Sequence, residues 1–291
     1  MKNSIIFLLT ISLLAACTPE PLDIDIRQAE TKPVVATQYY FDTITQQSAL
    51  IVTLTKTLTA TTGNRPQIDS NGFIVDQDYL VANAIVELST STGTITLEEV
   101  SPGFYYAFNV ELLDHEHCRV NASNTNGETI VSAETEVMAE VDFTSLSLSG
   151  PSSDRFINYT LTDNPGTPNW YLVNYLTKQQ KDTANYNDPK YIARRLTEQK
   201  LDFDLFTDSD FKNGTMSVSR KLENLQYDTI AIAVSNINKG YYDFLLTQKR
   251  YGLLVNQLKG EVINFPTNIK GGLGYFQLSR PKLRVLDVND R

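Results

Sequence analysis

Apolar and polar residues alternate along the chain from Pro33 onward, in short runs separated by Gly, Asn, Pro and Ser. In the run A-L-I-V-T-L-T-K-T-L, for example, Leu50, Val52 and Leu54 share one face and the residues between them share the other. A period of two with many β-branched residues is typical of β-strands. Because such runs recur roughly every 8–12 residues, the pattern predicts an N-terminal β-sandwich over residues 33–145.

The second half, residues 150–291, also contains alternating runs, including F-I-N-Y-T-L-T, W-Y-L-V-N-Y-L and T-I-A-I-A-V. Two stretches have a helical period instead. Asp188 can cap a helix and Pro189 can occupy its first turn, so we expect one helix near 188–200. A second is expected near 239–256. The chain is therefore predicted to be mainly β, with a second β-rich domain that contains one or two helices.

The first sixteen residues have the pattern of a secretory signal peptide. Lys2 is followed by an apolar run from Ile5 to Leu14 and by two alanines. That run is shorter than the roughly 20 residues that a membrane-spanning helix needs. Residues 1–16 are therefore predicted to direct export and to be removed, rather than to form part of the fold.

The sequence L-A-A-C at positions 14–17 resembles the lipobox of bacterial lipoproteins. In a lipobox the cysteine after two small residues is acylated, with palmitate among its acyl chains, and becomes the first residue of the mature protein. Cys17 is therefore the predicted lipidation site, and several acyl chains would hold it durably on a membrane. The alternative is an ordinary signal peptide with a chance cysteine. Residues 17–32, rich in acids and prolines, are predicted to be a tether.

The net charge of −9 argues against binding to nucleic acid and against docking on anionic lipid through a basic face. The chain has two cysteines, so once Cys17 is acylated Cys118 is the sole thiol and cannot form an intrachain disulfide. Stability must then come from buried apolar surface. The hydrophobic content of 41% is sufficient for one large core or two ordinary ones, and we expect two domains.

Residues 112–120, L-L-D-H-E-H-C-R-V, contain both histidines of the chain and one of its cysteines. His115 and His117 are two positions apart, whereas zinc hydrolases of the H-E-x-x-H type need a spacing of four on a helix. Alternation continues on both sides of this stretch, with one predicted face comprising Tyr106, Phe108, Val110, Leu112, then Cys118, Val120 and Ala122. This alternation predicts that residues 112–120 contain a hairpin loop and that Cys118 lies on the core face. The alternatives are adventitious or regulatory metal binding and catalysis.

The acidic run at 201–214 contains Asp208 and Asp210, spaced like calcium ligands in a binding loop. Lys212 stands where the next oxygen ligand would be, and Gly214 comes one residue late. We interpret this run as a solvated turn, with calcium binding left open.

Two further patterns are weak. Asp202 and Asp204 share one side of a possible strand, which leaves open a weaker acidic site. The G-G-L-G sequence at 271–274 is followed by a strand pattern rather than a helix, so a phosphate-binding loop is not supported. No catalytic, cofactor or metal residues are therefore predicted.

Together these features resemble one family, the Bacteroidota outer-membrane lipoproteins described as domain of unknown function 4249. The resemblance covers the whole mature chain and rests on the order of its motifs. These are L-A-A-C, K-P-V-V, I-V-T-L-T-K-T, N-A-I-V-E-L, S-P-G-F-Y, D-N-P-G-T-P-N-W-Y and N-F-P-T-N-I-K-G-G-L-G-Y-F. One departure is Cys118, where the family pattern has an aromatic residue.

The resemblance implies an N-terminal sandwich of the transthyretin-like or immunoglobulin-like kind. It also implies a neighbouring TonB-dependent transporter, an outer-membrane β-barrel. We therefore expect a non-enzymatic, lipid-anchored accessory protein on the outer membrane, exposed on the cell surface and binding such a barrel, without cofactors. The alternative is a structural or assembly component of a barrel-assembly or secretion complex. An enzyme would have to work with carboxylates alone, as glycosidases can.

Overall fold

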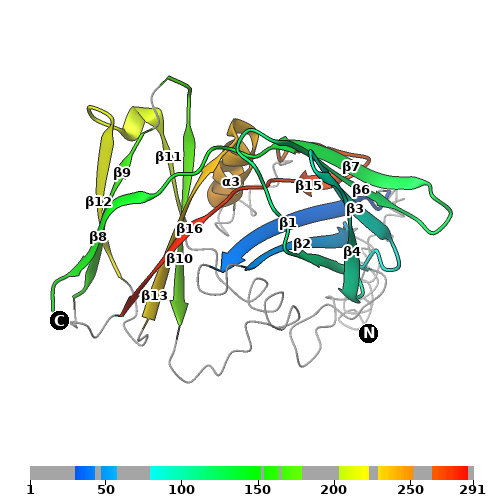
Figure 1. Ribbon diagram of the computed structural model, residues 1–291, viewed down its shortest axis with the longest axis horizontal. Coiled ribbons are helices and arrows are strands. Elements are labelled where there is room, and N and C mark those ends of the chain that lie inside the picture. Colours follow the sequence, from blue (N-terminus) through cyan, green and yellow to red (C-terminus); the bar gives the residue numbers. More distant parts are fainter. Residues whose placement is uncertain are drawn as a thin grey trace, which may run out of the picture.

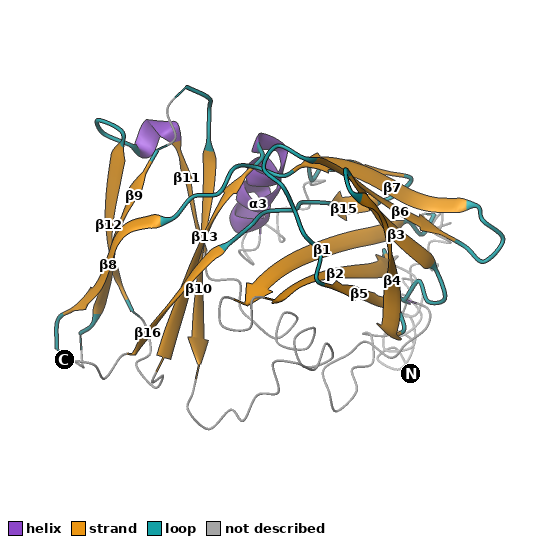
Figure 2. Cartoon of the chain, viewed as in Figure 1, coloured by secondary structure: helices purple, strands orange, loops and turns teal. Residues whose placement is uncertain are grey.

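The computed structural model describes eight stretches of the chain, and most of their residues lie in strands (Figure 1). The strands form two groups that lie side by side along the longest axis of the molecule, with one helix between them (Figure 2). The described stretches are residues 30–42, 47–57, 79–151, 154–163, 166–178, 203–222, 229–251 and 264–287.

The first group is a nine-stranded sheet in the order β14-β7-β6-β3-β4-β5-β2-β1-β15. It is bent into two layers at β4, because Gly93–Leu97 pair with β3 whereas Glu98–Ser101 pair with β5 in the other layer. The strands are β1 (Pro33–Asp42), β2 (Gln47–Lys56), β3 (Ile85–Thr90), β4 (Gly93–Ser101), β5 (Phe104–Phe108), β6 (His117–Ser123), β7 (Thr129–Glu136), β14 (Ile269–Lys270) and β15 (Leu273–Tyr275).

Alternation places every second residue of these strands between the two layers, where the first hydrophobic core forms. One layer contributes Leu50, Val52 and Leu54, as predicted, and the other contributes Val86 and Leu88. The N-terminal β-sandwich expected from the sequence is confirmed.

The second group is a sandwich of two antiparallel sheets, of three and four strands, in the orders β12-β9-β8 and β11-β10-β13-β16. Seven strands in this arrangement form an immunoglobulin-like sandwich. Its core lies between the sheets and includes Tyr159 and Tyr175. The strands are β8 (Phe143–Ser149), β9 (Phe156–Thr162), β10 (Trp170–Lys178), β11 (Phe203–Thr207), β12 (Thr215–Lys221), β13 (Thr229–Ile237) and β16 (Lys282–Asp287).

Helix α3 (Lys239–Tyr251) begins where the second helix was predicted to begin. Its Leu245 packs with Leu172 and Phe203 on the face of the four-stranded sheet that points away from the second core. The predicted residues 252–256 lie outside the described chain, as does the helix expected near 188–200. None of the described helices is long and apolar enough to cross a membrane.

Residues 269–275 leave the second group of strands and join the first. β14 pairs with β7 at one end of the nine-stranded sheet, and β15 pairs with β1 at the other end, in parallel. The predicted domain 150–291 thus lends two strands to the predicted domain 33–145. We call residues 268–278 the clasp, because they bind the outer strands of both layers.

Candidate functional site

The histidine stretch lies in a loop of residues 109–116, which we call the crossover loop. It was predicted to be a hairpin, and this is wrong. The strand before it, β5, pairs with β2 and β4, whereas the strand after it, β6, pairs with β3 and β7 in the opposite layer. The loop therefore carries the chain from one layer to the other. Local alternation could not reveal this, because both layers turn their apolar face toward the same core.

The phase of the alternation also differs from the prediction before the loop. Tyr105 and Ala107 face the core, while Tyr106 and Phe108 face outward. Asn109 adopts a φ of 55°, which interrupts the strand and lets Val110 point inward again. The carbonyl of Val110 then accepts hydrogen bonds from the hydroxyls of Tyr39 at 3.0 Å and Ser48 at 2.7 Å.

Glu116, between the two histidines, is the anchor of the crossover loop. Its Oε1 accepts hydrogen bonds from the backbone N–H of Ser91 at 2.6 Å and from the Ser91 hydroxyl at 2.5 Å, and its Oε2 accepts from the Leu113 N–H at 3.0 Å. Burial raises the pKa of this carboxyl, but these hydrogen bonds outweigh burial and leave the pKa below its ordinary value. The carboxylate thus holds two loops together.

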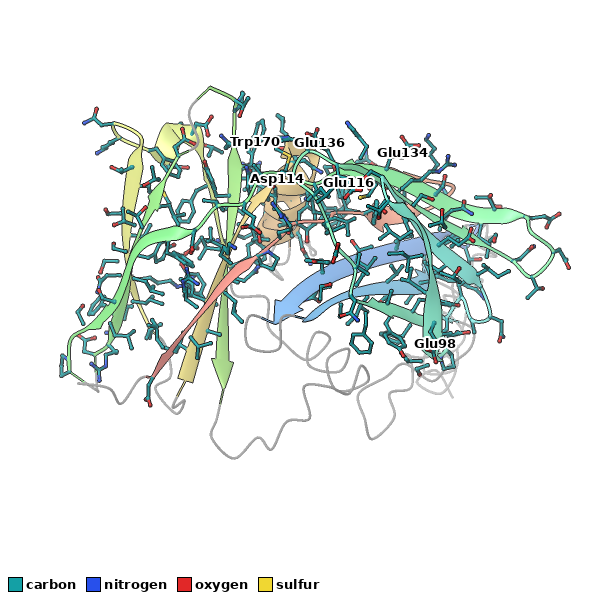
Figure 3. All side chains as sticks on the ribbon, viewed as in Figure 1. Glu98, Asp114, Glu116, Glu134, Glu136 and Trp170 are labelled. Carbon is teal, nitrogen blue, oxygen red and sulfur yellow. The ribbon has the colours of Figure 1, made fainter. Side chains whose placement is uncertain are left out.

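The two histidines do not act together. His115, with a φ of 60°, places its Nδ1 2.9 Å from Oε1 of Glu136, whereas His117 is exposed on β6. Figure 3 shows Asp114, Glu116 and Glu136 grouped where the crossover loop meets the end of β7. Of the described residues, no group of three or more His, Cys, Asp or Glu side chains could hold a metal ion.

Cys118 is buried in the first core, as predicted. Burial, with a smaller contribution from the nearby charge of Glu116, raises the pKa of its thiol to about 12. The thiol therefore behaves as a small apolar side chain. Residue Cys17, the predicted lipidation site, lies outside the described residues.

Asp204, left open as part of an acidic site, is occupied by donors. Its Oδ2 accepts from the Tyr175 hydroxyl at 2.9 Å and from Nη1 of Arg220 at 3.0 Å, and Nζ of Lys249 lies 3.5 Å from Oδ1. The Arg220 guanidinium also stacks 4.0 Å above the Tyr175 ring. Because Asp204 is on β11 and Arg220 is on β12, the pair joins the two sheets of the second sandwich. Asp202 lies outside the described residues.

Asp208 and Asp210 form a single 3-10 turn, and both carboxylates bind backbone N–H groups. Asp208 accepts from Asn169 at 2.9 and 3.0 Å, and Asp210 accepts from Thr207 at 2.8 Å. A calcium-binding loop directs its carboxylate oxygens at the ion, whereas these oxygens are directed at backbone N–H groups. This geometry agrees with the interpretation of the run as a turn. In the turn the two carboxylates hold the backbone at Asn169 and Thr207.

The G-G-L-G sequence forms the middle of the clasp, where the backbone passes very close to other strands. A Cβ at Gly272 would lie 2.6 Å from the Pro33 carbonyl oxygen, and one at Gly274 would come closer still to that of Val35. Gly274 also has a φ of 98°, which favours glycine. These glycines therefore allow the backbone of the clasp to approach the edge of β1 closely.

The clasp also delivers apolar side chains and hydrogen bonds to the first sandwich. Ile269, Phe276 and Leu278 are buried in the first core. The Asn268 side chain donates to the Glu134 carbonyl on β7 at 3.0 Å and to the Phe276 carbonyl at 2.8 Å. The first core is thus completed by residues near the end of the chain.

The junction between the two sandwiches is formed by residues that sequence reasoning missed. Asn238 caps α3 by accepting from the Tyr241 N–H at 2.8 Å, and it donates to the Thr135 hydroxyl on β7 at 3.0 Å. Its Oδ1 also accepts from the Tyr275 hydroxyl of the clasp at 3.1 Å. An asparagine before a helix can be identified as a cap from sequence, but its contacts to distant strands cannot.

Ion pairs add to this junction along the segment between β7 and β8. Glu140 pairs with Nζ of Lys282 at 2.6 Å and with Arg280 at 3.4 Å, and Asp142 pairs with Arg284. Arg280 also pairs with Asp114 of the crossover loop. Each pair is partly exposed and contributes little alone, but together they hold the crossover loop against the junction.

Comparisons with known proteins identify one family and a larger set of distantly similar solved structures. The family described as Domain of unknown function (DUF4249) matches residues 20–282. A solved chain titled "Cytokine receptor complex - Crystal form 1A" is 8% identical, with a TM-score of 0.24, covering 84% of this chain and 92% of that one. The chicken interferon gamma receptor alpha chain is 11% identical, with a TM-score of 0.19, covering 70% and 88%. No curated protein matches the chain.

Proposed function

This chain belongs to the family described as Domain of unknown function (DUF4249), and we propose that it is a lipid-anchored accessory protein of a bacterial outer membrane, of the Bacteroidota type. In this proposal it is a non-catalytic binding subunit of an outer-membrane β-barrel, a TonB-dependent transporter, and is exposed on the cell surface.

The observation that carries the proposal is L-A-A-C at positions 14–17, followed by the acidic tether to residue 32. β1 follows the tether directly, and Figure 1 shows β1 running toward the second sandwich. The chain therefore enters the fold at the end of the first sandwich that is remote from the second. An anchor at Cys17 would therefore be joined to the first sandwich, at the end that is remote from the second sandwich.

The way in which the chemically active side chains are used supports binding rather than catalysis. Glu116 binds Ser91, Asp204 binds Arg220 and the Cys118 thiol is buried. Each of them holds the fold together. The crossover loop, by contrast, presents Leu113 with 54% of its surface exposed on a backbone fixed from several sides. A rigid loop with an exposed apolar side chain is suited to contact with a partner.

Lipidation is tested by metabolic labelling with a palmitate analogue. The native chain should be labelled and should fractionate with membranes, whereas a Cys17→Ser variant should be unlabelled and soluble. Cys118→Ser is the matched control, since its thiol is buried and should not be acylated. A labelled Cys17→Ser variant would contradict the assignment of Cys17.

The partner is tested by purifying the tagged native protein from its own membranes in mild detergent. Recovery of a TonB-dependent transporter in stoichiometric amount is the expected result, and it should be reduced by Leu113→Asp but not by Ile85→Asp, which replaces another exposed apolar residue of the same sandwich. Consistent recovery of barrel-assembly or secretion machinery would favour the alternative, a structural or assembly component. If no barrel ever co-purifies, the proposal is wrong.

A further inference from the structure

β8 is a sheet edge without the features that usually protect such edges. It pairs with β9 on one side, and among the described residues no backbone hydrogen bond links its other side to another strand. Its sequence, F-T-S-L-S-L-S, contains no charged residue and no proline. Exposed edges in natural proteins normally carry lysine, proline or inward-pointing charges, because an open row of N–H and C=O groups can bind another strand.

The other described edges of the second sandwich do carry charges. β12 contains Arg220 and Lys221, β16 contains Lys282 and Arg284, and β11 contains Asp204. The two outermost strands of the first sandwich, β14 and β15, are two and three residues long. β8 therefore differs from the other edges of its own sandwich in charge, and from the outermost strands of the first sandwich in length.

The geometry of β8 leaves the backbone N–H and C=O groups on its outer side available for pairing with another strand. Leu146 and Leu148 pack against the second core, while Ser145, Ser147 and Ser149 are exposed. The register with β9 is irregular between Phe143 and Ser145 and regular from there to the end of the strand. Residues 145–149 thus form a regularly paired, uncharged edge with Ser147 at its centre.

We propose that this edge binds the same edge of a second copy of the chain, antiparallel about a twofold axis through Ser147. In a twofold contact each side chain meets the equivalent region of its copy, so charges of one sign on an edge face each other. β12 and β16 each carry two basic side chains whose acidic partners lie in the same chain, and a twofold contact through either strand would have to accommodate these charges. β8 brings serines against serines, and joins two three-stranded sheets into one of six strands by main-chain hydrogen bonds.

We expect this contact to be weak, so the experiment must be able to detect a weakly associated dimer. A single strand edge is smaller than the roughly 1,000 Å² expected of a stable interface. Two copies with a net charge of −9 also repel each other. Because salt screens that repulsion, association through β8 should increase with ionic strength, whereas a contact held by opposite charges would weaken.

Disulfide trapping tests the proposal in the full chain carrying Cys17→Ser, in which the remaining thiol, Cys118, is buried. Residues opposite one another in antiparallel strands have Cβ atoms about 4.5–5.5 Å apart, close to disulfide range. Ser147→Cys should therefore yield a disulfide-linked dimer under mild oxidation, in greater yield at high salt. Ser217→Cys is the matched control, because it is an exposed serine on β12, the other edge of the same sheet.

A further variant separates specific pairing from random collision. Adding Ser145→Lys and Ser149→Lys to Ser147→Cys places lysine opposite lysine across the twofold axis and should abolish the dimer, while an unchanged thermal transition shows that the chain is folded. Equal trapping at 147 and 217, trapping that survives the two lysines, or a chain that is never trapped at 147 would overturn the proposal. So would trapping at 147 only to another protein in native membranes. The proposal uses the fold alone, so it stands or falls separately from the proposed function.

Discussion

Glu116 shows how a residue that resembles a catalytic or metal-binding group can serve the fold instead. The two histidines of D-H-E-H were considered as ligands and the stretch was interpreted as a loop, but the carboxylate between them binds three donors from two loops. The prediction that Cys118 faces the core was right because alternation is a local property. The role of Glu116 could not be predicted, since Ser91 is remote in sequence and only the folded chain brings it close.

Replacing Glu116 with glutamine should destabilise the protein by about 1–3 kcal/mol, because an amide nitrogen would then face donors. Its folded pKa lies below the unfolded value of about 4.5. Its contribution is therefore present above pH 4.5 and is lost as pH falls through the folded pKa. Urea unfolding at pH 7 and at lower pH should show less pH dependence in the variant. Glu134→Gln, at an exposed position, is the control; equal losses in both variants would refute this role.

The Cys118 thiol should be unreactive in the native protein, because burial raises its pKa to about 12 and excludes reagent. In the Cys17→Ser chain, a thiol reagent at pH 8 should label it only after denaturant is added. Rapid labelling of the native chain would mean that the first core opens readily.

At the level of elements, strands were predictable where neighbours along the chain decide them, and their partners were not. The run at Leu50 and the run F-I-N-Y-T-L-T of β9 were recognised from alternation. The pairing of β14 with β7 and of β15 with β1 depends on residues far apart in sequence, so it could not be read from any window. The crossover loop was mistaken for a hairpin for the same reason. A short G-G-L-G gives no sign of the strand that it approaches.

Gly274→Ala should destabilise the protein by more than the roughly 1–3 kcal/mol of backbone strain, because the new Cβ would also collide with the Val35 carbonyl. Gly127→Ala is the informative comparison. Gly127 also has a positive φ, of 84°, but a Cβ added there would meet nothing within 4 Å, so strain acts without collision. Equal effects in chemical unfolding would show that the clasp does not fit tightly against β1.

At the level of the whole molecule, the clasp, the Asn238 contacts and the ion pairs of residues 140–142 link the two sandwiches at several points. The sequence predicted two domains, and the described residues form a core in each sandwich, but the chain passes between the sandwiches more than once. Cores connected in this way are expected to unfold together rather than independently. The amino-acid composition alone was compatible with either joint or independent unfolding of the two sandwiches.

Two intrinsic probes can test this. Trp170, the single tryptophan, lies in the second sandwich, and Cys118 lies in the first core. In the Cys17→Ser chain, urea curves from Trp170 fluorescence and from Cys118 labelling should coincide, with one calorimetric transition. Separate midpoints would show that the sandwiches are independent. Gly274→Ala should shift both curves if they are coupled, and the Cys118 curve alone if they are not.

The clasp also fixes an order of events for a chain that emerges N-terminus first from the ribosome. The first sandwich cannot acquire Ile269, Phe276 and Leu278 until those residues have emerged. A truncated chain would keep the edges of β1 and β7 open and its first core incomplete, in a state that proteases recognise. The sandwich that is made first is thus closed only by residues that are made much later.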